Sequence, residues 1–406
     1  MKSYIIYWLR MLRCAIVGPP LYYIWNTVLT FFFLVGVIAY SYQFKNGLIM
    51  TNLTDQVSWG AYIANFTFLV GVAAAAVLLV FPTYVLHRED VKDVVLLGEL
   101  MAFAAITMCL LFITVDLGRP DRFTHIMPVL GRLNFPRSVL AWDVVVLNGY
   151  LFLNLHVPGY LLYMAYKGRK PNKWLYLPFV FVSIAWAVSI HTVTAFLYSG
   201  LGGRPFWNTA ILAPRFLVSA FAGGPAILTI VFLLISKYTA LKVRPQVFQL
   251  LKQILMVFLP INMFLFGSEV YKEFYTDSIH TESMKYLFFG VHGHAMLKPY
   301  IWASIVMSFT AMGIFFTPRL RNNQTIFVIG CVLTILGIWI EKGMGLIIPG
   351  FIPTPLGDLV EYTPSLVEFF VCLGIWSFGA LLFTVLAKVA VAIQVGELRE
   401  TAHKST

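Results

Sequence analysis

Long apolar runs restrict the fold of this chain more than any other feature of its sequence. A run of about 18 residues or more can cross a bilayer as a helix. Ten such runs occur, at approximately residues 20–42, 57–86, 94–116, 138–166, 174–198, 212–236, 246–272, 290–316, 325–347 and 363–393. A β-barrel is excluded, because its strands alternate polar and apolar residues over only about ten positions. We therefore predict an all-α, polytopic membrane protein with about ten transmembrane helices.

Loop charge gives the predicted bundle an orientation. If the N-terminus is cytoplasmic, the cytoplasmic segments hold more Lys and Arg than the outer loops, and the C-terminal tail adds Lys404. We therefore predict a multi-pass protein of the cytoplasmic (inner) membrane, surrounded by lipids, with both termini in the cytoplasm. The run after Arg13 is too long for a signal peptide, so we expect it to remain as an anchor.

The outer loop after the third run departs from this charge rule. It holds four arginines, at positions 119, 122, 132 and 137. Because positive charge is disfavoured on the outer side, we expect these arginines to have a local role, such as pairing with a partner or an acidic group.

Charge and cysteine content exclude two other classes of function. Only 12% of the residues are charged, and the net charge of +11 mainly reflects the cytoplasmic loops. No soluble domain carries a basic face interleaved with aromatic residues, so nucleic acid is not an expected partner. The cysteines form neither a Cys-x-x-Cys nor a Cys-x-x-Cys-His sequence. We expect this chain to bind no haem, no iron–sulfur cluster and no metal ion of its own.

The pattern in the middle of the chain predicts two related sets of four helices. Small residues, which let helices approach closely in lipid, come early in the run that opens each set, at 71–76 and at 220–224. We predict four parts: residues 1–56 are an N-terminal segment with a peripheral helix, and 57–198 are a first four-helix bundle. Residues 199–347 are a second four-helix bundle, and 348–406 are a last helix with a cytoplasmic tail.

Polar side chains inside the runs gather toward the outer side. Those in the predicted outer half are Asn65, Asp116, Asp143, His191, Glu269, Glu341, Lys342 and Glu368. Charges at such depth are costly and commonly mark a pathway or a binding site. Two structural alternatives remain open: Glu341 pairs with Lys342 or Glu269 only to satisfy itself, and Asn65 forms a hydrogen bond between helices.

The polar residues of the first bundle have the chemistry that a quinone site requires. A quinone needs a flat apolar slot, donors at its carbonyls and groups that exchange protons as electrons move. Histidine titrates in the useful range, and a buried carboxylate can act as an acid or a base. His191 shares one helix face with Thr194 and Tyr198. An arginine–aspartate pair at the mouth could orient the base, and Trp59, Trp142, Trp186 and Tyr198 could wall the slot.

Three short patterns are similar to those of a known family. They are Asp116-Leu-Gly-Arg-Pro120 at a helix end, Trp59-Gly60 at the start of the preceding helix, and Ser138…Trp142 after the motif loop. Together they resemble the NrfD/PsrC (polysulfide reductase) family of membrane subunits over about residues 55–320. Within it, residues 52–148 look nearest to the Dsr-type and quinone-reductase-complex membrane subunits of sulfate-respiring prokaryotes.

The resemblance implies a function and partners. It implies a menaquinone or menaquinol site near the outer face and a four-cluster iron–sulfur subunit docked on the periplasmic side. Further redox subunits would be of the multihaem cytochrome c or molybdopterin type. The motif positions carried onto this chain are Trp59, Asp116, Arg119 and Pro120. The polysulfide-reductase anchors have eight helices, so the first and last runs depart from the pattern.

Chemistry and resemblance together give three sets of candidate residues. The predicted catalytic residues are Asp143, His191, Asp116 and Arg119. The predicted quinone contacts are Trp59, Asn65, Trp142 and Tyr198. A hypothetical proton path inward uses Glu99, Asn148, Glu269, Glu341 and Lys342.

Two other functions compete with this prediction. A b-type cytochrome needs axial histidines on facing helices at one depth, and His191 has no clear mate in the sequence. A secondary transporter would explain two repeated halves, but its polar groups belong at the midplane rather than toward one face.

Overall fold

The computed structural model describes residues 2–127, 129–278 and 281–400, and within them it contains helices and no β-strand. Ten helical segments of this part are long and apolar enough to cross a membrane: Pro20–Asn46, Ala61–Tyr84, Lys92–Asp116, Val139–Tyr166, Lys173–Ser199, Leu212–Tyr238, Pro245–Thr276, Lys298–Phe316, Gln324–Phe351 and Leu366–Gln394. The predicted all-α, polytopic fold is confirmed. The predicted tail residue Lys404 lies outside the described residues.

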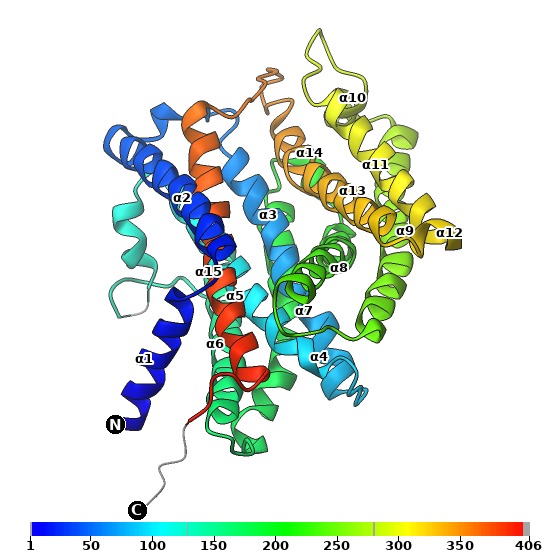
Figure 1. Ribbon diagram of the computed structural model, residues 1–406. Coiled ribbons are helices and arrows are strands. Elements are labelled where there is room, and N and C mark those ends of the chain that lie inside the picture. Colours follow the sequence, from blue (N-terminus) through cyan, green and yellow to red (C-terminus); the bar gives the residue numbers. More distant parts are fainter. Residues whose placement is uncertain (1, 128, 279–280, 401–406) are drawn as a thin grey trace, which may run out of the picture.

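The first group of helices forms a bundle around a central, apolar helix. Its members are α3 (Ala61–Ala74) with its continuation α4 (Val77–Tyr84), α5 (Lys92–Asp116), α6 (Val139–Tyr166) and α7 (Leu177–Ser199). The span of α3 and α4 is 89% buried. Figure 1 shows α3 with α5 and α6 on one side and α8 of the second group on the other.

The second group also contains four long helices. Its long helices are α8 (Leu212–Tyr238), α9 (Pro245–Thr276), α11 (Lys298–Phe316) and α13 (Gln324–Lys342). The short helices α10 (Thr281–Phe288) and α12 (Pro318–Arg321) lie in the connections between them, and the short α14 (Met344–Ile347) follows α13. Short 3₁₀ turns occur at η1 (Leu48–Met50), η2 (Pro120–Ile126), η3 (Lys173–Leu175), η4 (Pro205–Trp207) and η5 (Ile348–Phe351).

The two groups meet closely where α3 and α4 pass α8. A Cβ atom added to Gly224 of α8 would collide with Ala75 at the junction of α3 and α4. The small residues of the two openings therefore allow the close approach that the sequence predicts. The exact division of the chain into four parts stays a prediction.

Some helices begin and end where the sequence places them, and others do not. Ser138, Asn323 and Ser365 each accept a hydrogen bond from the first turn of α6, α13 and the last helix, α15 (Leu366–Gln394), as N-cap residues do. The predicted run 290–316 begins too early, because Gly290, His292 and Gly293 adopt positive φ in a turn and α11 starts only at Lys298.

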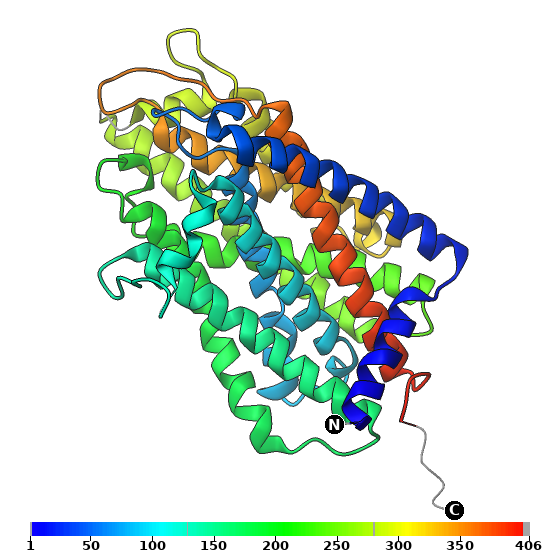
Figure 2. The ribbon, with the colours of Figure 1, turned by 90° about the vertical axis from the view of Figure 1, so that its left-hand side faces the viewer.

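Helices α2 (Pro20–Asn46) and α15 (Leu366–Gln394) pack together against the outside of the first group (Figure 2). As predicted, α2 is peripheral, with 11% of its span buried. The short α1 (Lys2–Ile16) precedes it, and the Arg10 side chain donates a hydrogen bond to the Arg399 carbonyl. Both described chain ends therefore lie on one side, called here the termini side. The opposite far side is the predicted outer side.

We predict that Gly374→Leu separates α2 from α15. A Cβ atom on Gly36 of α2 would lie 2.5 Å from the Gly374 Cα atom, so the two backbones leave no space for a side chain. Overpacking of this kind costs about 1–3 kcal/mol. Thermal unfolding of the purified protein should show a lower Tm for Gly374→Leu. Gly267→Leu is the control, because a Cβ atom there meets nothing within 4 Å. Equal Tm values for the two variants would contradict this packing.

Candidate functional site

A buried acid and three hydroxyl groups converge inside the first group. Asp143 of α6 is 1% exposed, and its Oδ1 atom accepts a hydrogen bond of 3.2 Å from Thr194 of α7. The hydroxyls of Tyr198 on α7 and Thr67 on α3 lie 2.5 Å apart. Three helices, α3, α6 and α7, thus supply an acid and hydroxyl groups to one buried cluster.

His191 lies on the same face of α7, as the spacing of His191, Thr194 and Tyr198 predicts, and all three are buried. The His191 Nδ1 atom is 3.1 Å from the Ala187 carbonyl oxygen. Because a carbonyl oxygen only accepts, Nδ1 carries the hydrogen and Nε2 is left as an acceptor. Among the described residues, Nε2 has no hydrogen-bond partner.

Aromatic rings cover the far side of this cluster. Trp59 contacts Tyr198 edge to face at 5.6 Å and stacks on Trp207 at 5.7 Å between ring centroids. Phe351 packs edge to face against both tryptophans. Trp59 and Tyr198 were predicted from the sequence, whereas Trp207 and Phe351 were missed. These two lie in separate 3₁₀ turns far along the chain, and only the fold brings them here.

Two predicted residues of α6 do not join the cluster. Trp142 is 40% exposed and its indole donates to the Pro136 carbonyl. Asn148 is also exposed, and its amide donates to Val144 within the same helix. Each residue turns the helix by about 100°, so positions one and five residues from Asp143 point away from the side of the helix that carries the acid.

The motif after α5 divides into a buried and an exposed part. The Asp116 Oδ1 atom is shielded from solvent and has no hydrogen-bond partner among the described residues. The Arg119 side chain is 64% exposed and pairs with Asp121 at 2.8 Å. This hydrogen bond holds the pKa of Asp121 below its usual value. The arginine–aspartate pair at the mouth is therefore Arg119–Asp121, and the structure leaves Asp116 apart from it.

Asp116 faces a second acid, Glu368 of α15, closely enough for their charges to interact. Glu368 is fully buried and accepts hydrogen bonds of 2.9 Å from the backbone N–H groups of Asn52 and Ser365. It also accepts one from the hydroxyl of Tyr362. Burial, together with the neighbouring Glu368 charge, raises the pKa of Tyr362. Tyr362 therefore stays protonated and keeps its role as a donor.

The added helix α2 also reaches this region. Gln43 of α2 is 3% exposed, accepts from the Tyr62 hydroxyl at 2.5 Å and donates to the Val115 carbonyl at 2.7 Å. The two helices that depart from the eight-helix pattern thus supply polar groups at the far end of the first group.

Asn65 links three helices rather than pointing into open space. Its Oδ1 atom accepts from the indoles of Trp339 on α13 at 3.0 Å and Trp376 on α15 at 2.9 Å. Its amide donates to the Ala61 carbonyl. This geometry favours the hydrogen bond between helices over a ligand contact.

A buried ion-pair network occupies the second group. Arg215 of α8 is 2% exposed and bridges Glu269 of α9 and Glu341 of α13, the latter at 2.8 Å. Asn262 donates a further bond of 3.0 Å to Glu341. The structural alternative for Glu341, a pairing with Lys342 or Glu269, has the wrong partner, because the cation that pairs with Glu341 is Arg215, which the sequence analysis missed. A charged residue just inside an apolar run is the signal that would have found it.

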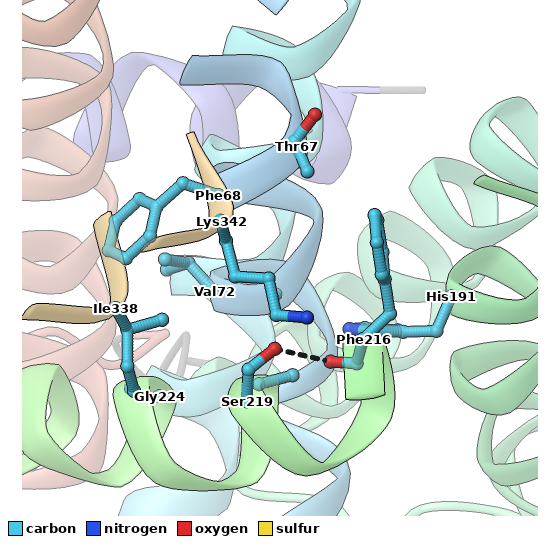
Figure 3. A pocket seen from close by; sticks show the side chains of 12 residues that line it. Thr67, Phe68, Val72, His191, Phe216, Ser219, Gly224, Ile338 and Lys342 are labelled. Atoms are coloured by element: carbon cyan, nitrogen blue, oxygen red, sulfur yellow. Dashed lines mark hydrogen bonds between the residues drawn. The ribbon is translucent and has the colours of Figure 1, made fainter. Parts of the chain in front are cut away.

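Lys342 points to the other side, toward the first group. Its amine is buried, lies 4.9 Å from the centre of the Phe216 ring and has no hydrogen-bond partner among the described residues. Figure 3 shows this amine and the His191 ring directed toward the same space, which Ser219 also lines. The cavity volume of about 10 Å³ is room for about one water molecule. Both unpaired nitrogens thus face one small cavity at the junction of the two groups.

Glu99 lies apart from these clusters. It is 2% exposed near the termini-side end of α5, and its Oε2 atom has no hydrogen-bond partner in the described part of the chain. Its charge interacts with Tyr84 and Tyr150. Within the described residues, no chain of hydrogen bonds links it to Asp143 or His191, so Glu99 is not part of the far-side site.

No group of three or more His, Cys, Asp or Glu side chains in the described ranges is placed to hold a metal ion. The far-side site presents carboxyl, hydroxyl, imidazole and aromatic groups.

Comparisons with known proteins agree with this description. The family model described as Polysulphide reductase, NrfD matches residues 50–353. A candidate dimethyl sulfoxide reductase membrane subunit of Halobacterium salinarum is 26% identical, over 88% of each chain. An Hdr-like menaquinol oxidoreductase integral membrane subunit of Archaeoglobus fulgidus is 22% identical, over 91% of this chain and 93% of the relative. The menaquinone reductase integral membrane subunit of Nitratidesulfovibrio vulgaris is 22% identical, over 92% and 91%.

We predict that Arg215→Leu strongly destabilises the protein. The substitution leaves the carboxylates of Glu269 and Glu341 buried without their cation, a change that costs about 3–5 kcal/mol. The measurement is Tm of the purified protein in detergent. Arg119→Leu removes an exposed ion pair and serves as the control, with an unchanged Tm expected. A Tm for Arg215→Leu equal to that of the unmodified protein would show that the network does not stabilise the fold.

Proposed function

Because the chain belongs to the NrfD family of polysulphide-reductase membrane subunits, we propose that it is the quinone-reactive membrane subunit of a respiratory oxidoreductase complex. It binds menaquinone or menaquinol near the far side of the first group and exchanges electrons with an attached iron–sulfur subunit. The convergence of Asp143, Tyr198 and His191 behind the Trp59 ring is the observation that carries this proposal.

The names of the relatives support a quinone as substrate. Two of them are named as menaquinol or menaquinone oxidoreductase subunits, and all three are named as subunits of reductases or oxidoreductases. His191 faces the amine of Lys342, so a b-type haem held by two histidines does not suit this position.

The residues present have the chemistry that a quinone ring needs. Trp59 and Trp207 supply flat apolar rings, and the paired hydroxyls of Tyr198 and Thr67 include a donor that would serve a ring carbonyl once the two aromatic rings part to admit the quinone. A bound quinone supplies the two-electron redox chemistry, which no side chain of this chain provides.

The acid and the imidazole hold and move protons at this site. Thr194 donates to the Oδ1 atom of Asp143 and orients its carboxyl group, leaving Oδ2 to take or give a proton. The Ala187 carbonyl fixes the tautomer of His191, so that its Nε2 atom is the proton acceptor. Both groups are buried, which keeps bulk water away from them.

The iron–sulfur subunit would dock on the far side, the predicted periplasmic side. The loop after α5 exposes Arg122, Arg132 and Arg137 there, against the positive-inside rule. A partner with an acidic face would pair with these cations and bring its cluster toward Trp59. Further redox subunits, of the multihaem cytochrome c or molybdopterin type, would attach to that partner.

We predict that Asp143→Asn and His191→Ala abolish quinone-linked turnover of the intact complex. General acid–base groups contribute about 100-fold to 10,000-fold to a rate, so a loss of that size is expected. The measurement is electron transfer between a menaquinone analogue and the natural redox partner.

Asn148→Ala is the matched control on α6, because its side chain faces away from the acid. Normal subunit assembly, checked by copurification, separates a chemical role from misfolding. Unchanged turnover in assembled Asp143→Asn and His191→Ala complexes would exclude this site.

We further propose that protons pass from the first group to the second. His191 Nε2 and Lys342 Nζ face one cavity, and the neighbouring Glu341 lies in the ion-pair network with Arg215 and Glu269. A water molecule in the cavity would accept from Lys342 and donate to His191, joining the two groups. Glu99 would take part only through further waters.

We predict that Lys342→Met uncouples proton movement from electron transfer. The membrane potential generated by the complex in liposomes should fall while quinone turnover continues, because Lys342 lines the small cavity and packs on Phe216 rather than on the Trp59 and Trp207 rings of the proposed ring site. Glu341→Gln, which keeps Arg215 paired with Glu269, tests the next step.

A Lys342→Met complex that generates the same potential per electron as the unmodified one would refute this path. If the unmodified complex generates no potential, protons are not moved at all, and the quinone proposal remains to be judged by the turnover experiment.

A further inference from the structure

A second, larger cavity lies at the opposite end of the second group. It has a volume of about 570 Å³, between the termini-side ends of α8 and α9 and the beginning of α13. The connections 238–245 and 316–324 lie on the termini side, because an even number of spans separates each from the chain ends. The cavity is thus far from the proposed quinone site, and no step of the proposed function uses it.

Two cations line this cavity without any acid. Lys252 and Arg321 are among its lining residues, and no Asp or Glu is. In the described ranges, neither cation forms a salt bridge with a carboxylate. Lys252 lies 4.8 Å from the centre of the Phe327 ring, and Arg321 uses one nitrogen to contact Met256 and the Phe315 carbonyl. The remaining donors of both side chains are available to an anion.

The lining of the cavity has a polar part and an apolar part. Gln249, Gln253, Asn322 and Gln324 add uncharged donors and acceptors to the lining. The apolar part of the lining consists of Leu233, Val243, Pro245, Phe248, Met256 and Phe327. Lys252 is two helical turns after the start of α9 at Pro245, roughly 10 Å along the axis. Lys252 therefore lies near the termini-side end of α9, and Arg321 lies at the end of α12 in the termini-side connection between α11 and α13.

We propose that this cavity binds the phosphate headgroup of an anionic phospholipid from the leaflet on the termini side. Basic pockets between transmembrane helices suit such headgroups, and each cation near the membrane surface contributes to the attraction. The apolar walls favour a lipid over free phosphate, because glycerol and acyl carbons gain from contact with Leu233 and Phe248 whereas an inorganic ion does not. The volume lies within the range typical of ligand sites.

The test is native mass spectrometry of the intact complex, released from nanodiscs that contain equal parts of phosphatidylglycerol and phosphatidylcholine. We expect phosphatidylglycerol to be retained preferentially. Lys252→Gln and Arg321→Gln should each reduce the phosphatidylglycerol-to-phosphatidylcholine ratio by about fivefold, and the double variant by more. Lys170→Gln is the matched control, an exposed cation on the termini side of the first group. It should leave the ratio unchanged.

A second variant separates a cavity site from general surface attraction. Gln249→Trp keeps both cations but fills part of the cavity, so it should also lower phosphatidylglycerol retention. A Tm measurement on the complex in neutral lipid then compares added phosphatidylglycerol with inorganic phosphate. Stabilisation by the lipid alone supports the proposal.

Three results would overturn it. These are equal stabilisation by inorganic phosphate, equal loss of retention in the Lys170→Gln control, and full retention in the double variant. Displacement of the bound lipid by a menaquinone analogue would instead assign the cavity to a quinone.

Discussion

The free-energy cost of burying charge in a membrane constrains how the helices of this protein are placed, because each buried charge needs a partner. Arg215, Glu269 and Glu341 come from three helices of the second group, and each is less than 5% exposed. None of these charges is stable at such depth alone, so the positions of α8, α9 and α13 are set partly by the need to bring them together. The adjacent Lys342 cannot share this network, because consecutive side chains of a helix point in different directions.

The close contact between α3 and α8 brings the ion-pair network of the second group next to the acid and imidazole site of the first group. Small residues at Ala75 and Gly224 allow the helices to approach closely. The Lys342 amine therefore reaches the cavity that His191 lines from the first group. In the proposed function, quinone chemistry occurs on the first-group side of this junction and proton movement continues on the other. The lipid-headgroup cavity lies at the opposite end of the second group, where it would anchor those helices without touching the redox site.

Local pattern was enough to predict many parts of the site. Helix periodicity places His191, Thr194 and Tyr198 on one buried face, and the structure confirms this. The position of Asp143 inside an apolar run marks it as a candidate, and the structure shows that its side chain is buried. Periodicity did not separate Asp143 from Trp142 and Asn148, which face outward, because an apolar helix surrounded by lipid has no polar face to mark its rotation.

The sequence by itself determined the number of membrane-spanning helices, the all-α fold and the family. It did so because bilayer thickness sets the length of an apolar run, and because the motif around Asp116 is local. Only the tertiary structure decided that Trp207 stacks on Trp59, that Arg215 pairs with both acids and that Tyr362 donates to Glu368. Most of these partners are far apart in the chain, and a side chain's partner depends on helix rotation and packing, which no single run of residues contains.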